Sequence, residues 1–192
     1  VDEYAVHYPF TYVAPDDKVL LSPYMDLPNP ETRTLLTQWT AEFWKPGERI
    51  QTYSLLQRLA LYINHNLSYQ IREEPGVQTA QQTLTNNTGS CRDFAVLFME
   101  TARCLGLASR FVSGYLQSPP SATDFGATHA WAEVYLPGAG WKGFDPTTGE
   151  IVGSDHIAVA VARSPESVPP IAGSYFGNAE SSLDVGVWLT KC

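Results

Sequence analysis

Residues 88–94 read Thr-Gly-Ser-Cys-Arg-Asp-Phe and place one cysteine, Cys91, at the predicted first turn of a helix. Ser90 and Asp93 have the spacing of a capping box, in which Ser90 is the N-cap residue and Cys91 the first helical residue. Backbone N–H groups in a first helical turn have no intrahelical partner, and the helix dipole there favours negative charge. The position therefore stabilises a thiolate, and its free N–H groups can hold an oxyanion.

Two later segments supply groups that suit this cysteine. Residues 129–136 predict a strand that begins with His129, and residues 141–147 predict a second strand that ends at Asp145. The link between them reads Pro-Gly-Ala-Gly, so we expect a β-hairpin that brings the two side chains close together. Nucleophile, base and orienting carboxylate then follow in the order used for cysteine-based acyl transfer.

The rest of the pattern predicts an α+β protein. Apolar residues at helical spacing predict helices over 50–67 and 91–105, with a short helix near 79–84. After them we expect strands at 109–116, 129–136, 141–145, 156–162 and 183–189, joined mostly by turns. Turn-linked strands form an antiparallel sheet, so we predict helices packed on such a sheet, with the cysteine at a helix N-terminus.

Composition excludes several classes of function. The chain has 192 residues, 44% of them hydrophobic, which is enough for one core plus an appendage. Its net charge of −8, without a basic cluster, excludes a nucleic-acid partner. No apolar run reaches the about 20 residues of a membrane-spanning helix, so no membrane partner is expected. The 3 cysteines form no Cys-x-x-Cys pair, so we expect neither a zinc site nor a disulfide framework, and a reducing, cytoplasmic location fits best. No calcium-loop motif is present, so we expect no metal and no other cofactor.

Three motifs resemble the signature blocks of the bacterial transglutaminase-like superfamily, whose catalytic core is papain-like. They are Gly-Ser-Cys-Arg-Asp-Phe at 89–94, His-Ala-Trp-Ala-Glu at 129–133 and Phe-Asp-Pro-Thr at 144–147. The resemblance implies a triad of Cys91 as nucleophile, His129 as general base and Asp145 as third member. It also implies that residues 36–192 form the catalytic domain, and that residues 1–35 are an extended connector, the tail of a β-rich domain missing from this chain.

Two further residues are candidates for the site. By the same resemblance, a second oxyanion donor is expected upstream of the cysteine, and Tyr69 is our choice over Gln81 and Gln82. Trp131 lies two residues after His129, on the same face of a regular strand, and is a candidate for the substrate groove. Ordinary packing is the alternative interpretation of both Tyr69 and Trp131.

The segments around the second strand carry two other interpretations. Residues 117–128 predict a surface loop that either walls the substrate groove or only connects two strands. The histidines outside the triad, His7, His65 and His156, are interpreted as ordinary residues, not as ligands.

Three functions follow from these residues. The favoured one is a cysteine protease or amidase that cleaves peptide or amide bonds through a thioester acyl-enzyme. A protein-glutamine amine acyltransferase, meaning a true transglutaminase, and a non-catalytic peptide-binding module on the same fold are the alternatives. The expected partner is a peptide or protein substrate, and the oligomeric state is left open.

Overall fold

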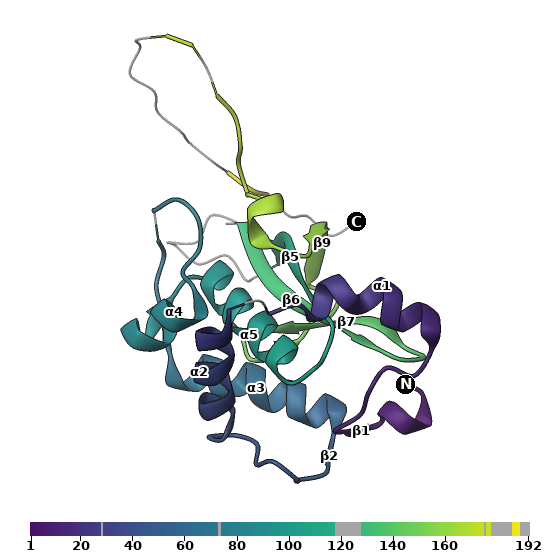
Figure 1. Cartoon of the computed structure of the whole chain (residues 1–192). Helices are drawn as coiled ribbons and strands as arrows, with labels where there is room; N and C mark the ends of the chain where they lie inside the picture. The colour runs from purple at the N-terminus through teal and green to yellow at the C-terminus, as the bar shows by residue number, and fades with distance from the viewer. Residues whose placement is uncertain (28, 73, 118–127, 175, 178–185, 189–192) are drawn as a thin grey trace.

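The computed structural model describes residues 1–27, 29–72, 74–117, 128–174, 176–177 and 186–188 (Figure 1). In this part of the chain the α-helices are α1 (Pro15–Met25), α2 (Pro30–Thr40), α3 (Thr52–Asn66), α4 (Ala80–Asn86) and α5 (Cys91–Cys104). The main sheet contains β5 (Ser109–Leu116), β6 (Thr128–Leu136), β7 (Gly140–Asp145), β8 (Glu150–Ile151) and β9 (His156–Ala162). Shorter elements are η1 (Glu3–Ala5), β1 (His7–Tyr8), β2 (Ile50–Gln51), β3 (Ser68–Tyr69), β4 (Thr88–Gly89) and η2 (Pro165–Ser167).

The main sheet is antiparallel, with the strand order β8-β7-β6-β5-β9. The helices precede it in sequence; α5 packs on β5 and β6, and α2, α3 and α4 pack around α5 (Figure 1). The predicted α+β fold class is thereby confirmed. The loop expected at 117–128 and the strand expected at 183–189 lie largely outside the described residues.

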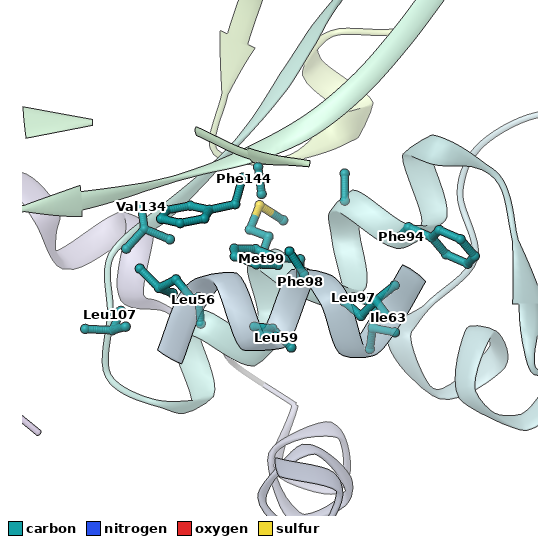
Figure 2. Packing of buried hydrophobic residues seen from close by; sticks show 14 of the residues in the cluster. Leu56, Leu59, Ile63, Phe94, Leu97, Phe98, Met99, Leu107, Val134 and Phe144 are labelled. Atoms are coloured by element: carbon teal, nitrogen blue, oxygen red, sulfur yellow. The ribbon is translucent and has the colours of Figure 1, made fainter. Parts of the chain in front are cut away.

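Helix α5 is deeply buried because both the sheet and the other helices cover it. Its residues from Asp93 to Met99 are all buried. Leu97 and Phe98 belong to the buried cluster, and the Phe98 ring stacks on Phe144 of β7 with 5.7 Å between centroids (Figure 2). Burial of each such side chain contributes about 1.5–3 kcal/mol. This packing fixes the direction of α5 and therefore the place of its N-terminal residue.

The first 35 residues are not the extended connector that the sequence predicted. Pro15 occupies the first turn of α1 together with Asp16 and Asp17. Proline is preorganised for that position and acidic side chains favour a helix N-terminus, so these local signals outweigh the prolines elsewhere in the segment. A second helix, α2, begins at Pro30, still inside the predicted connector.

Tyr12 is one of the residues that hold the segment ahead of α1 on the core. The Tyr12 hydroxyl donates to the Tyr135 carbonyl oxygen at 3.0 Å and accepts from the Ala108 N–H at 2.8 Å.

A β-rich domain ahead of this segment stays a prediction. Among the described helices, none combines the length and the apolar character needed to cross a membrane.

Candidate active site

Cys91 is the first residue of α5, as the capping pattern predicted. The Ser90 N–H donates to Asp93 Oδ2 at 2.8 Å, and Ser90 Oγ donates to the same oxygen at 2.9 Å. The residue before the cap must be small, because a Cβ on Gly89 would lie only 2.9 Å from the Asp93 Cβ. Cys91 is therefore held, half-buried, at the positive end of the helix dipole.

Asp93 fastens the start of α5 to the preceding loop. Its buried carboxylate accepts from the Gln78 N–H at 2.7 Å and from Arg72 Nη1 at 2.8 Å. Burial acts to raise the pKa of this carboxyl, but hydrogen bonds from Ser90, Gln78 and Arg72 outweigh burial and lower it. The carboxylate stays ionised and keeps the N-terminal end of α5, with Cys91, in one position.

The β6–β7 hairpin brings His129 and Asp145 together. Ala132 of β6 pairs with Phe144 of β7, so the start of β6 and the end of β7 lie at the same end of the hairpin. His129 Nε2 is 2.7 Å from Asp145 Oδ2, and the two side chains are 11% and 0% exposed. A short polar contact shielded from water in this way is strong and directional.

The His129 ring also faces Cys91, which lies close enough to raise the pKa of the ring. Because Nε2 is engaged by Asp145, Nδ1 is the ring nitrogen that is available to the thiol. Burial acts to lower the pKa of His129, but the hydrogen bonds with Asp145 and Cys91 and their charges outweigh burial and raise this pKa to about 10. At neutral pH the His129 ring is therefore an imidazolium.

Asp145 is held by donors on both of its oxygens. Oδ1 accepts from the Thr147 N–H at 2.8 Å, and Oδ2 accepts from His129 and from His156 Nε2, the latter at 3.0 Å. Burial acts to raise the pKa of this carboxyl, but the hydrogen bonds from His129, His156 and Thr147 and the charge of His129 lower it far below the usual range. Asp145 is thus a fixed negative charge.

His156 is the site residue that sequence reasoning missed. It was interpreted as an ordinary residue, yet its side chain is 3% exposed and bonded to Asp145. The signal that could have found it is its place at the first position of β9, eleven residues after Asp145, where the connection crosses to the other edge strand and returns the chain to the same end of the sheet.

The same three side chains bear on the question of a metal. In the described part of the chain, His129, Asp145 and His156 are the group whose ligand atoms all lie within 4.8 Å of one another. A metal ion would need an unprotonated Nε2 on each histidine. The Gly153 N–H faces His156 Nδ1 at 3.4 Å, which leaves the His156 proton on Nε2, and His129 is protonated. These hydrogen-bond roles suit two donors on one carboxylate oxygen, and metal independence stays a prediction.

Tyr69 lies beside the strand β4, which leads into Cys91. Strand β3 pairs in parallel with β4 and sets Tyr69 opposite Gly89, two residues before Cys91. The ring is 53% exposed and packs edge-on to Phe94 with 6.4 Å between centroids. The side chain of Gln82, an alternative candidate, is held in the cap of α4, where its Oε1 accepts from the Thr79 N–H.

Trp131 is not placed where the sequence interpretation put it. Its side chain is 1% exposed, so it does not line an open groove. Its ring lies 6.2 Å from the His129 ring and 5.2 Å from the His156 ring, centroid to centroid. Trp131 is covered by its neighbours and packs against both histidine rings.

Two cavities differ in their relation to the site. The larger, about 790 Å³, lies against Leu105 and Gly106 at the far end of α5, away from Cys91. A cavity of about 420 Å³ is lined by Ser90 and Arg92 and extends to Arg72 and to residues 169–171. We assign the smaller cavity to the site because Ser90 and Arg92 are the chain neighbours of Cys91.

The unfolding free energy is expected to depend on pH through these groups. The pKa of His129 is raised from 6.5 to about 10, so its stabilising contribution is complete below about pH 6.5 and is lost as the pH rises towards 10. The pKa values of Asp145 and Asp93 are lowered, so their contributions are present above about pH 4 and are lost as the pH falls. Urea unfolding followed by circular dichroism should show both losses, and a stability that rises from pH 7 to 10 would contradict the His129 assignment.

Comparison with known proteins identifies relatives of this chain. The profile described as the transglutaminase-like superfamily matches residues 38–146. Proteins of Mycobacterium bovis and Mycobacterium tuberculosis, both named as uncharacterized, are 33% identical over 173 residues, which cover 85% of this chain and 54% of each relative. The chain thus spans about half the length of these curated relatives.

A solved structure shares the fold. A protein from Cytophaga hutchinsonii, described as a proposed cysteine protease, has a TM-score of 0.66 at 22% identity. The match covers 87% of this chain and 54% of that one. At this identity the likeness concerns the fold alone.

Proposed function

Because the chain belongs to the transglutaminase-like superfamily, we propose that it is a cysteine protease or amidase with Cys91 as nucleophile, His129 as acid and base, and Asp145 as orienting carboxylate. The observation that carries the proposal is the buried pair of His129 and Asp145, 2.7 Å apart, set close enough to Cys91 at the start of α5 for the cysteine to raise the pKa of His129. Residues that serve only to pack a core have no need for a buried ion pair aimed at a helix N-terminus.

Acylation begins with attack of the Cys91 thiolate on the carbonyl carbon of a peptide or amide bond. The carbonyl π electrons move to oxygen, and the Cys91 N–H at the start of α5 donates to this oxyanion. Tyr69, next to Gly89, is proposed as the second donor. When the intermediate collapses, the C–N bond breaks and protonated His129 gives its proton to the leaving amine, so a thioester and a free amine result.

Deacylation returns the enzyme to its starting state. Neutral His129 takes a proton from water, the hydroxyl adds to the thioester carbonyl, and the thiolate leaves as the acid product forms. Asp145 keeps the His129 ring oriented and stabilises its positive charge without taking the proton. An amine in place of water would give the transferase reaction with the same residues.

The surroundings of the site support a peptide or protein substrate. The cavity of about 420 Å³ beside Ser90 and Arg92 is lined by prolines and by both charge signs, including Arg72 and Glu166. With a net charge of −8, we propose neither a nucleic-acid nor a membrane partner. A cytoplasmic location is part of the same proposal, because a free nucleophilic thiol is maintained in a reducing compartment.

The test separates the three functions in one incubation. The purified chain is mixed with dimethylated casein and a dansyl-labelled alkylamine, and new α-amino groups, released ammonia and bound dansyl fluorescence are measured, with Cys91→Ala as control. Cys91-dependent new amino groups or ammonia without bound dansyl is the expected result. Preferential dansyl incorporation would establish a transferase instead, and no Cys91-dependent product would favour a binding module.

A further inference from the structure

His156 meets the triad at a single oxygen atom. Its Nε2 is 3.0 Å from Asp145 Oδ2, the oxygen that also binds His129 Nε2 at 2.7 Å. The His156 side chain is more buried than that of His129, at 3% against 11% exposed. A histidine that lies behind the carboxylate and is this buried does not reach a substrate.

The turn between Gly153 and His156 decides which ring nitrogen of His156 donates a hydrogen bond. The His156 N–H donates to the Gly153 carbonyl oxygen at 3.2 Å, and the Gly153 N–H in turn faces His156 Nδ1 at 3.4 Å. Nδ1 is therefore the acceptor nitrogen, and Nε2 carries the proton that is donated to Asp145. The turn thus presents His156 Nε2 as a fixed N–H donor.

Packing holds the His156 ring in place. The Trp131 ring meets it edge-on with 5.2 Å between centroids and an interplanar angle of 80°. Gly114 of β5 makes this possible, because a Cβ there would collide with the Trp131 ring and the backbone of Ile157. Strand β9 can therefore lie close enough to β5 for its first residue to reach Asp145.

We propose that His156 is a positioning residue, which fixes the Asp145 carboxylate so that Oδ2 stays directed at His129. The inference rests on the proposed function of the triad. Asp145 is the last residue of β7, and without His156 the side-chain partner of Oδ2 within the described part of the chain is the His129 ring alone. Thr147 holds only the other oxygen. His156 supplies a second, rigid donor that does not take part in proton transfer.

Variants at position 156 test the proposal. Phenylalanine keeps a planar ring but has no donor, whereas the glutamine amide reaches the same distance with an N–H. With p-nitrophenyl acetate as the probe, His156→Phe is expected to lower kcat by about 10²-fold at nearly unchanged KM, the loss associated with a misplaced catalytic group. His156→Gln is expected to recover most of kcat. His65→Phe, an exposed histidine of α3, is the matched control.

A second readout does not depend on any substrate. The rate of Cys91 alkylation by iodoacetamide, measured by peptide mass mapping, is expected to fall in His156→Phe and to recover in His156→Gln, with thermal unfolding midpoints recorded for both. Wild-type kcat and alkylation in a folded His156→Phe variant, or a His156→Gln variant as impaired as His156→Phe, would overturn the positioning role alone. Wild-type Cys91 that reacts no faster than Cys104 would overturn the proposed function, and the role of His156 with it.

Discussion

The Cys91→Ala variant is expected to lose turnover by a factor of about 10⁶, the scale seen when the nucleophile of a triad is removed. The reason is chemical: without the sulfur no thioester can form, and an alanine methyl group cannot replace it. The fold should be retained, because Cys91 is half-buried at the first position of α5 and alanine has a high helix propensity. Turnover of p-nitrophenyl acetate and the mass of the acetylated protein measure the loss directly.

The matched control for this variant is Cys104→Ala. Cys104 ends the same helix, and its sulfur is 3.3 Å from the Thr37 hydroxyl oxygen, far along the chain from the histidine pair. It should leave turnover and acetylation close to wild type. Acetylation that persists in Cys91→Ala but vanishes in Cys104→Ala would move the nucleophile and refute the assignment.

The Asp145→Asn variant is expected to lower kcat by about 10⁴-fold, as loss of the orienting carboxylate does in serine triads. Here an amide cannot satisfy the surroundings in either orientation. If its oxygen accepts from His129 and His156, its NH₂ group faces the Thr147 N–H; if it is flipped, the NH₂ group faces two histidine donors. Two donors that face each other in a buried site cost about 1–3 kcal/mol. The amide is therefore expected to move away from this position, and the His129 ring then loses the hydrogen bond that fixes its orientation.

The pH profile of Asp145→Asn gives an independent readout. The hydrogen bond and charge of Asp145 help to raise the pKa of His129 to about 10, so removing the charge lets this pKa fall towards its ordinary value of 6.5. Fewer His129 rings are then protonated at pH 7–9, and the alkaline limb of the kcat profile should move to lower pH. The control is Asp155→Asn, an exposed acid next to His156 that should leave the profile unchanged.

Much of the site could be predicted from sequence because its signals are local. The capping pattern at Ser90 and Asp93 predicts where α5 begins, and the short Pro-Gly-Ala-Gly link predicts the hairpin that joins His129 to Asp145. Each depends on residues within one helical turn or one hairpin. Helix α1 also begins with local signals, namely Pro15 and two acidic residues in its first turn, although the sequence analysis predicted an extended connector there.

The features that sequence reasoning missed depend on contacts between distant elements. Trp131 shares the strand face of His129, but whether that face is open or covered depends on residues of the neighbouring strands β5 and β9, namely Gly114 and the His156 ring that meets Trp131 edge-on. The contact of Tyr69 with the segment before Cys91 likewise depends on a two-residue pairing between β3 and β4. The β5–β9 pairing and the β3–β4 pairing have no periodic pattern in the sequence that predicts them.

The amino-acid sequence by itself determined the α+β class, the start of α5 at Cys91 and the approach of His129 to Asp145, because capping, apolar periodicity and a tight turn act over a few residues. Only the tertiary structure decided that His156 shares the Asp145 oxygen and that Trp131 closes the wall behind it. That convergence requires the end of β7 and the start of β9 to meet, and it depends on the sheet order, on the close β5–β9 approach at Gly114 and on the burial of charges that no local pattern encodes.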